Sequence, residues 1–365
     1  MIPLCVPEIN GNEWRYIKDC LDTNWVSSAG SYVNSFEDRF SEYIGIEKAV
    51  VTMNGTAALE LALRALGIGD GDEVIVPSLT FISPVNVVKY VGAEPVFVDV
   101  CEDTWVMDTN KIEELISNRT KAILPVHLYG HPVDMDKIME IAVKYNLYVI
   151  EDATESLGSK YKEKHLGTIG HIGCFSFNGN KLITTGAGGM LITNNTEWSD
   201  RAKFLSTQTK KVTNNKAFYH PEIGYNYRMP NVLAALGCAQ LECIDEYIAK
   251  KREHAAYYNS KLKNKYSIVL PVEKDWAYNV FWLYSILIEE DYGISRDDLI
   301  NEFAKYEIET RPFFMPVHKM PPFLDSKKGD LSITINLSAK GINLPSSVGL
   351  TNDQIDIICS IINSF

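Results

Sequence analysis

The sequence lacks the features that mark several broad classes of protein. None of its seven cysteines forms a CxxC pair, so we expect free thiols in a reducing compartment and predict no metal site. No apolar run approaches the ~20 residues that a membrane helix needs. The N-terminal segment 1–10 has no basic start and carries Glu8, unlike a signal peptide. We therefore expect a soluble, cytoplasmic protein.

Positive charge is also scarce. Lys and Arg total 35 against 47 Asp and Glu, which gives a formal net charge of −12. Because such a surface repels phosphate backbones, we predict no nucleic-acid binding. No GxGxxG motif follows the first predicted strand, which argues against an NAD-dependent oxidoreductase. An anionic small-molecule substrate would need a local positive site within this acidic surface.

The chain does have enough apolar residues for a large core. It has 365 residues, of which 46% are hydrophobic. Over the first two-thirds, short apolar runs alternate with helical patterns. The runs predict strands at 74–76, 95–98, 122–126 and 147–150, and the patterns predict helices at 54–66, 84–91, 111–116 and 135–145. This alternation predicts an α/β fold with a mostly parallel sheet and helices on both faces.

The chain after residue 170 has a different character. Runs at 172–177 and 190–193 are typical of more antiparallel strands, and a long helical stretch extends from about 230 towards 262. A strand at 280–288 and helices at 296–306 and 352–362 follow. We predict a large domain at 1–244 and a small C-terminal α+β domain at 245–365.

Three local features carry candidate chemistry. The strand before Asp152 places that carboxylate at a strand end, where ligands bind, although a helix N-cap is an alternative. Lys181 lies in a hydroxyl-rich turn, where desolvation would make its amine nucleophilic, although most lysines are simply exposed. Gly55 and Thr56 open a helix and present free N–H groups to a phosphate, although capping explains them equally well.

The order and spacing of these features resemble a known family. Over essentially its whole length the chain is similar to the DegT/StrS-type sugar aminotransferases. The matching segments lie at 11–13, 25–28, 54–59, 71–77, 125–130, 151–153, 176–189, 224–228, 309–316 and 343–345. The resemblance implies the fold-type I architecture of aspartate aminotransferase, with pyridoxal 5′-phosphate (PLP) as the cofactor.

The resemblance also implies residue roles. Lys181 would bind PLP covalently and move a proton between the cofactor and the sugar, and Asp152 would pair with the pyridinium nitrogen. Glu155 would lie beside the phenolic oxygen, where the family often has Gln. Phe81 would stack on the cofactor ring. The cofactor phosphate would be held by Gly55, Thr56 and Ser176, and by Asn226 from a second subunit. The resemblance therefore implies a homodimer with shared active sites.

The substrate implied by the resemblance is a nucleotide-linked 4-keto-6-deoxy sugar that is aminated at C4, with glutamate as donor. Segments 178–181 and 206–209 resemble UDP-linked N-acetylhexosamine enzymes, which we expect here. Segments 309–318 and 341–345 resemble GDP-perosamine synthases, which remain the alternative. Arg311, His318 and His220 are candidate substrate contacts, because an Arg fork suits a diphosphate. A salt bridge, a core histidine and a solvated loop histidine are their respective alternatives.

The family pattern is not matched everywhere. Ala187 replaces a common Glu, and Thr154 replaces a common Ala. A non-catalytic regulator with the same fold is the alternative from another class. The presence of both Lys181 and Asp152 argues against it, since a degenerate member would be expected to lose one of them.

Overall fold

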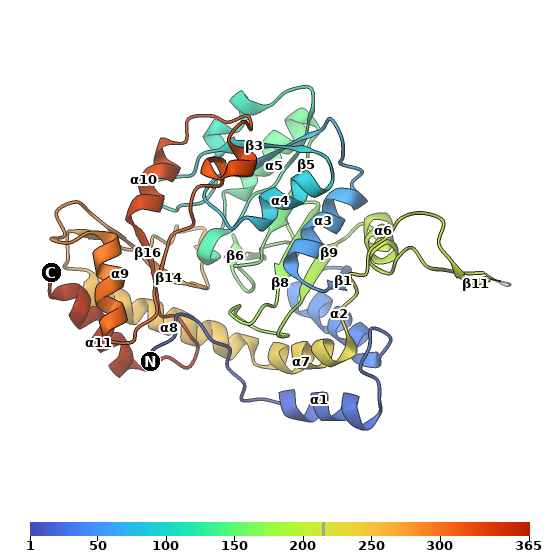
Figure 1. The fold of residues 1–365 in the computed structure, drawn as a ribbon, viewed down its shortest axis with the longest axis horizontal. Coiled ribbons are helices and arrows are strands. Elements are labelled where there is room, and N and C mark those ends of the chain that lie inside the picture. Colours follow the sequence, from blue (N-terminus) through green and yellow to red (C-terminus); the bar gives the residue numbers. More distant parts are fainter. Residues whose placement is uncertain (214–215) are drawn as a thin grey trace.

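A large twisted sheet forms the centre of the protein in the computed structural model, which describes residues 1–213 and 216–365 (Figure 1). Its strands are β1 (Lys48–Thr52), β2 (Glu73–Pro77), β3 (Glu94–Val98), β4 (Thr120–Ile123), β5 (Tyr148–Asp152), β8 (Ile172–Ser176) and β9 (Gly189–Thr193). They lie in the order β1-β9-β8-β5-β4-β2-β3. Neighbouring strands from β3 to β8 are parallel, and β9 is antiparallel to both β8 and β1. The prediction of an α/β fold with a mostly parallel sheet is confirmed.

Helices cover both faces of this sheet because successive side chains of a buried strand point to opposite sides. In β2, Ile75 packs into the cluster that contains Ile138 of α5 (Met135–Tyr145). Val74 and Val76 pack into the opposite cluster with α3 (Gly55–Ala65) and α4 (Ser83–Tyr90). The strand is buried throughout, which explains its continuous apolar sequence.

Further helices surround this core. They are α1 (Glu13–Asp22), α2 (Ser31–Ile44), α6 (Thr196–Ser206), α7 (Asn231–Glu242), α8 (Ile244–Leu262), α9 (Arg296–Lys305), α10 (Ser332–Lys340) and α11 (Asn352–Asn363). The predicted single helix from 230 to 262 is in fact α7 and α8, because the backbone leaves the helical conformation at Cys243 (φ −105°, ψ 3°). Helices α1, α2, α6 and α10 and strand β1 were not predicted from the sequence.

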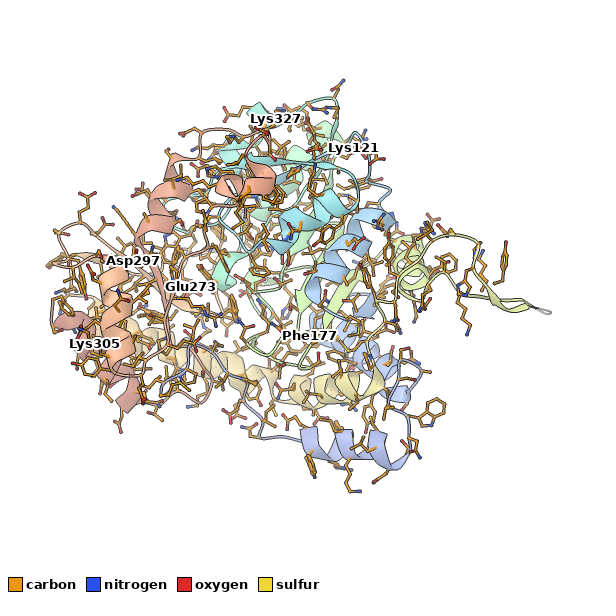
Figure 2. All side chains as sticks on the ribbon, in the orientation of Figure 1. Lys121, Phe177, Glu273, Asp297, Lys305 and Lys327 are labelled. Carbon is orange, nitrogen blue, oxygen red and sulfur yellow. The ribbon has the colours of Figure 1, made fainter. Side chains whose placement is uncertain are left out.

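A second, antiparallel sheet lies at the C-terminal side. Its strands β12 (Ile268–Val269), β14 (Tyr284–Ile288), β16 (Gly341–Leu344) and β15 (Arg311–Pro312) lie in that order. Residues of α8, α9 and α11 share one hydrophobic cluster with β14 and β16. Figure 2 shows Asp297 and Lys305 on the outside of this part, whereas Phe177 lies inside the molecule. The proposed boundary at 244/245 falls at the start of α8, and the division into two domains remains a prediction.

One predicted helix is wrong. Residues 111–116 form parts of two 3₁₀ turns, η1 (Thr109–Lys111) and η2 (Glu113–Leu115), instead of an α-helix. Ile112 and Leu115 are the buried residues of this segment, and an i, i+3 pair is satisfied by a 3₁₀ turn as well as by an α-helix. So short a segment also gains too few hydrogen bonds to stabilise an α-helix.

The smaller elements complete the fold. β6 (Lys160–Tyr161), β7 (Lys164–His165) and β13 (Ala277–Tyr278) form a small sheet, and β10 (Lys211–Thr213) pairs with β11 (Lys216–Tyr219). The remaining 3₁₀ turns are η3 (Leu128–Gly130), η4 (Val317–Lys319) and η5 (Pro321–Phe323). The hairpin β10–β11 projects away from the body of the protein in Figure 1. No helix within residues 1–213 and 216–365 has the length and apolar character that a membrane crossing requires.

Candidate active site

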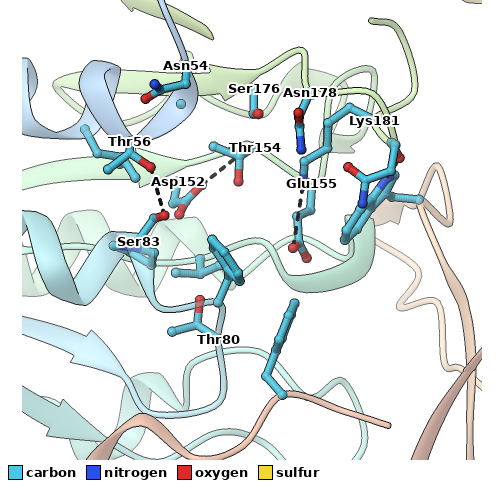
Figure 3. Close-up of a pocket in the computed structure, with 18 of the residues that line it drawn as sticks. Asn54, Thr56, Thr80, Ser83, Asp152, Thr154, Glu155, Ser176, Asn178 and Lys181 are labelled. Carbon is cyan, nitrogen blue, oxygen red and sulfur yellow. Dashed lines mark hydrogen bonds and ion pairs between the residues drawn. The ribbon is translucent and has the colours of Figure 1, made fainter. Parts of the chain in front are cut away.

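A pocket of about 530 Å³ opens at the carboxyl ends of β5 and β8, beside the N-terminus of α3 (Figure 3). In sheets of this kind, ligands bind at the carboxyl ends of strands, and cofactor pockets have about this size. The C-terminal antiparallel sheet supplies the other wall through Arg311 and Asn343, and the segments next to it contribute Trp282 and Phe314. The site therefore lies between the large sheet and the C-terminal part of the chain.

The N-terminus of α3 forms one end of the pocket. Asn54 caps the helix by accepting the N–H of Ala57 at 2.8 Å, and Thr56 donates its hydroxyl hydrogen to Ser83 Oγ at 2.8 Å. Ser176, at the end of β8, lies so close that a Cβ added to Gly55 would be 3.0 Å from the Ser176 Cβ. Free N–H groups and the positive end of the helix dipole make this a suitable anion site.

Asp152 ends β5 with a buried carboxylate, 2% exposed. Its Oδ1 accepts the N–H of Thr154 at 3.0 Å, in a turn and not at the start of a helix. Burial raises the pKa of this carboxyl, while the hydrogen bond and the charge of Lys181 oppose that effect. A cation that reached this carboxylate inside the pocket would offset the cost of burying the charge.

Lys181 follows β8 in a turn closed by its own N–H, which donates to the Asn178 carbonyl at 3.0 Å. Its side chain is 13% exposed, and its Nζ lies 3.7 Å from Glu155 Oε1. Nζ is also 3.7 Å from the centre of the Trp282 ring. Burial lowers the pKa of the Lys181 amine, although Glu155 and Asp152 favour its charged form. A buried lysine with a lowered pKa is suited to nucleophilic attack on a carbonyl.

Glu155 is the second buried carboxylate of the pocket and is 6% exposed. Its Oε2 accepts the N–H of Tyr129 at 3.0 Å. Burial raises the pKa of Glu155 to about 6, with Lys181 acting in the opposite direction. Tyr129 itself has a left-handed backbone (φ 53°), which a residue with a side chain rarely adopts. With a pKa of about 6, the Glu155 carboxyl changes charge just below neutral pH.

Aromatic side chains line the opposite wall. Phe81 is half exposed, and its ring centre lies 5.8 Å from that of Phe314. Tyr129 stacks on Phe314 at 5.8 Å and faces Trp282 at 6.4 Å. At the mouth, Arg311 pairs with Glu309 at 2.9 Å and remains largely exposed. The wall presents flat apolar faces to a planar ring, and the mouth presents a guanidinium to an anion.

The structure brings together most of the residues singled out in the sequence. The pocket is lined by Gly55, Thr56, Phe81, Asp152, Glu155, Ser176, Lys181 and Arg311. Three candidates lie elsewhere. His318 is buried against Phe97 and bonds Ser78 Oγ through Nδ1 at 2.6 Å, so its geometry is that of a core histidine. This packing does not support a substrate contact by His318.

The two remaining candidates lie on the segment around the projecting hairpin. His220 is exposed and bonds the carbonyl of Gln208 through Nδ1 at 2.7 Å. Asn226 pairs with Thr207 in an isolated bridge. Neither lines the pocket of its own chain. A contact with this pocket would have to come from a second subunit.

Two aromatic residues of the pocket, Trp282 and Phe314, were not predicted from the sequence, nor was Tyr129, which stacks on Phe314. Trp282 lies in an apolar run that is typical of a core strand, and no sequence signal separates a core tryptophan from one beside a buried amine. The proximity of Tyr129 to Glu155 depends on an unusual backbone conformation that the sequence does not reveal. Segments 125–130 and 309–316 match the family pattern, and this match is the signal that could have found Tyr129 and Phe314.

The fold, together with a buried lysine and a buried strand-end aspartate in one pocket, defines the class of PLP-dependent aminotransferases. The chain belongs to the DegT/DnrJ/EryC1/StrS aminotransferase family, whose model matches residues 7–363. Its relatives include the GDP-perosamine synthases of Escherichia coli O157:H7 and Caulobacter vibrioides. They are 48% and 44% identical to it, over 100% and 97% of this chain and 98% and 95% of theirs.

Solved structures agree with this membership. A DegT DnrJ EryC1 StrS aminotransferase from Brucella abortus superimposes with a TM-score of 0.90 at 30% identity, covering 97% of this chain and 95% of its own. The PLP-form of a putative sugar aminotransferase from Streptococcus pneumoniae gives a TM-score of 0.92 at 27% identity, covering 100% and 98%. The chain is thus a sugar aminotransferase, and its cofactor is pyridoxal phosphate.

The pocket fits this cofactor. The free N–H groups at the start of α3 suit the phosphate, and the close approach of Gly55 to Ser176 leaves a narrow cradle. The buried carboxylate of Asp152 suits the protonated ring nitrogen, and the aromatic wall suits the ring. Lys181 Nζ is within the same pocket. When bound, the cofactor supplies a carbonyl carbon that carries the amino group and a ring that withdraws electrons from it.

Proposed function

We propose that this protein transfers an amino group from glutamate to C4 of a GDP-linked 4-keto-6-deoxy sugar. The two relatives named GDP-perosamine synthase, which are 44–48% identical over nearly the full chain, support the GDP-linked sugar. A third protein of that name, from Vibrio cholerae, is 38% identical. This similarity favours the GDP-linked alternative over the UDP-linked N-acetylhexosamine that the sequence segments suggested.

The observation that carries the proposal is the position of Lys181, buried in one pocket with Asp152 and Glu155. In this proposal Lys181 binds the cofactor, and its Nζ then moves a proton between the cofactor carbon and C4 of the sugar. Asp152 keeps the ring nitrogen protonated, because a buried carboxylate gains most by pairing with a cation. Glu155 contacts the phenolic oxygen of the cofactor.

The remaining cofactor contacts follow from the same pocket. Gly55, Thr56 and Ser176 hold the phosphate, and Phe81 stacks on the ring. Arg311, at the mouth, binds the diphosphate of the substrate with its planar guanidinium. Asn226 completes the phosphate site of a second subunit, so the proposed enzyme is a homodimer.

A non-catalytic regulator is the alternative from another class. A pleiotropic regulatory protein from Geobacillus stearothermophilus is 34% identical over 331 residues. The presence of both the buried lysine and the buried aspartate in one pocket favours an enzyme, because a regulator has no use for an amine whose pKa is lowered by burial.

The test is to incubate the protein with PLP, glutamate and GDP-, UDP- or dTDP-linked 4-keto-6-deoxy sugars, and to identify products by mass spectrometry. We expect the amino sugar from the GDP-linked substrate and none from Lys181→Ala. Lys274→Ala is the matched control, since Lys274 is a partly exposed lysine that pairs with Asp103 outside the pocket, and it should keep full activity. Turnover by Lys181→Ala would refute the role of Lys181, and preference for a UDP-linked sugar would refute the substrate.

A further inference from the structure

Trp282 lies beside Lys181 but has no role in the proposal above. It is in the segment between β13 and β14, is 4% exposed, and lines the pocket. Its ring centre is 3.7 Å from Lys181 Nζ, on the face of the ring. An ammonium over a tryptophan face is attracted by the negative face of the ring, and most strongly where water is excluded.

Trp282 also holds the backbone from which Lys181 projects. Its indole N–H donates to the carbonyl of Asn180, the residue before Lys181, at 2.7 Å. The Cys5 thiol donates to the same carbonyl at 3.2 Å. One side chain thus restrains Lys181 at both ends, through the main chain and through the amine.

Trp282 is itself firmly anchored. Its carbonyl accepts a hydrogen bond from the buried Lys251 Nζ at 2.6 Å, and Lys251 also donates to the carbonyl of Ser346. The preceding residue, Phe281, has a left-handed backbone (φ 50°), and its N–H donates to Asn279 Oδ1 at 2.7 Å. A non-glycine residue in this conformation is held there only by its surroundings, and such positions cluster at functional sites.

We propose that Trp282 is a positioning residue for transamination, whose ring face receives the ammonium of Lys181 whenever Lys181 is not bonded to the cofactor. The inference rests on the proposed role of Lys181. Nζ then lies between the ring and the Glu155 carboxylate, 3.7 Å from each. When the neutral amine takes a proton from one carbon, the resulting ammonium is held in this place until it delivers the same proton to the next carbon.

The ring face favours only the charged form of Lys181. A desolvated cation–π contact is strong enough to change the pKa of a lysine by about one unit. Trp282→Leu should therefore lower the pKa of Lys181, whereas Trp282→Phe keeps an aromatic face and should keep most of the effect. Trp282→Phe loses the N–H donated to Asn180, however, and with it about tenfold in PLP affinity.

The test uses the full chain loaded with pyridoxamine phosphate, so that Lys181 is free. The pH dependence of Lys181 labelling by a small amine-directed reagent is followed by peptide mass spectrometry, and PLP affinity is measured separately. The matched control is Trp198→Phe, in α6 and outside the pocket, which should change neither quantity. We expect the labelling midpoint to fall by about one pH unit in Trp282→Leu and to stay near that of wild type in Trp282→Phe.

An unchanged midpoint in folded Trp282→Leu, or an equal fall in both variants, would overturn the ring-face role. Unchanged PLP affinity in Trp282→Phe would overturn the backbone role. Should Trp282→Leu not fold, Trp282→Met takes its place as the variant without an aromatic face, with the same expected fall in the midpoint, and Trp282→Phe still decides the backbone role. The role of Lys181 is tested independently by borohydride reduction of wild-type enzyme with PLP, which must label the peptide containing Lys181.

Discussion

Replacing Glu155 by Gln removes a buried carboxylate whose pKa is raised from 4.5 to about 6. Because the folded protein holds this proton more tightly than the unfolded chain does, the stability that Glu155 contributes is fully present below pH 4.5. It is lost as the pH rises through 6. The difference of about 1.5 between the two pKa values corresponds to about 2 kcal/mol. Gln is neutral at every pH, so it avoids this loss.

The expected result is therefore a difference that depends on pH. Relative to wild type, Glu155→Gln should gain about 2 kcal/mol of unfolding free energy between pH 4 and pH 7.5. Other groups titrate in both proteins and cancel. The measurement is urea unfolding of the cofactor-free proteins at pH 4, 6 and 7.5.

A surface carboxylate supplies the matched control. Glu222 pairs with Arg201 at 2.7 Å, and this contact lowers the pKa of Glu222. A carboxylate whose pKa is lowered by folding contributes stability at pH values above its pKa in the unfolded chain, and this contribution is lost as the pH falls. Glu222→Gln should therefore cost more stability at pH 7.5 than at pH 4. The two variants should thus respond to pH in opposite directions. A difference between wild type and Glu155→Gln that stays constant from pH 4 to 7.5 would refute the reasoning.

Two further predictions concern the proposed catalytic groups. Asp152→Asn keeps the size of the side chain and removes its charge. Stopped-flow measurement of the half-reaction with glutamate should therefore show a rate lowered by about 100-fold, while the protein stays yellow with bound PLP. Near-normal rates would mean that Asp152 only stabilises its own turn, by accepting the N–H of Thr154. Mixing inactive Lys181→Ala with an inactive Asn226→Ala variant should restore activity in heterodimers if subunits share sites; no recovery after verified subunit exchange would contradict the shared site.

Local sequence determined the general fold and the centre of the pocket. Apolar runs such as 74–76 predict buried strands because every side chain of a parallel strand is covered, and polar residues at strand ends then meet at one edge of the sheet. Asp152 and the start of α3 could be singled out in this way, whereas their roles and that of Lys181 followed from the resemblance of the surrounding segments to the family. The same local signals were too weak at 111–116, where two buried residues three apart suit a 3₁₀ turn and an α-helix equally.

Only the tertiary structure decided which side chains surround Lys181. Trp282 is 101 positions away in the chain, and its contact with Lys181 depends on how the segment before β14 meets the turn after β8. His318 carries a titratable ring like any candidate ligand, and only packing against Phe97 and Ser78 reveals its place in the core. Composition and periodicity indicate which residues of a helix or strand face the protein interior. The partner across the pocket is set by the packing of distant elements, because contact energies act in space and not along the chain.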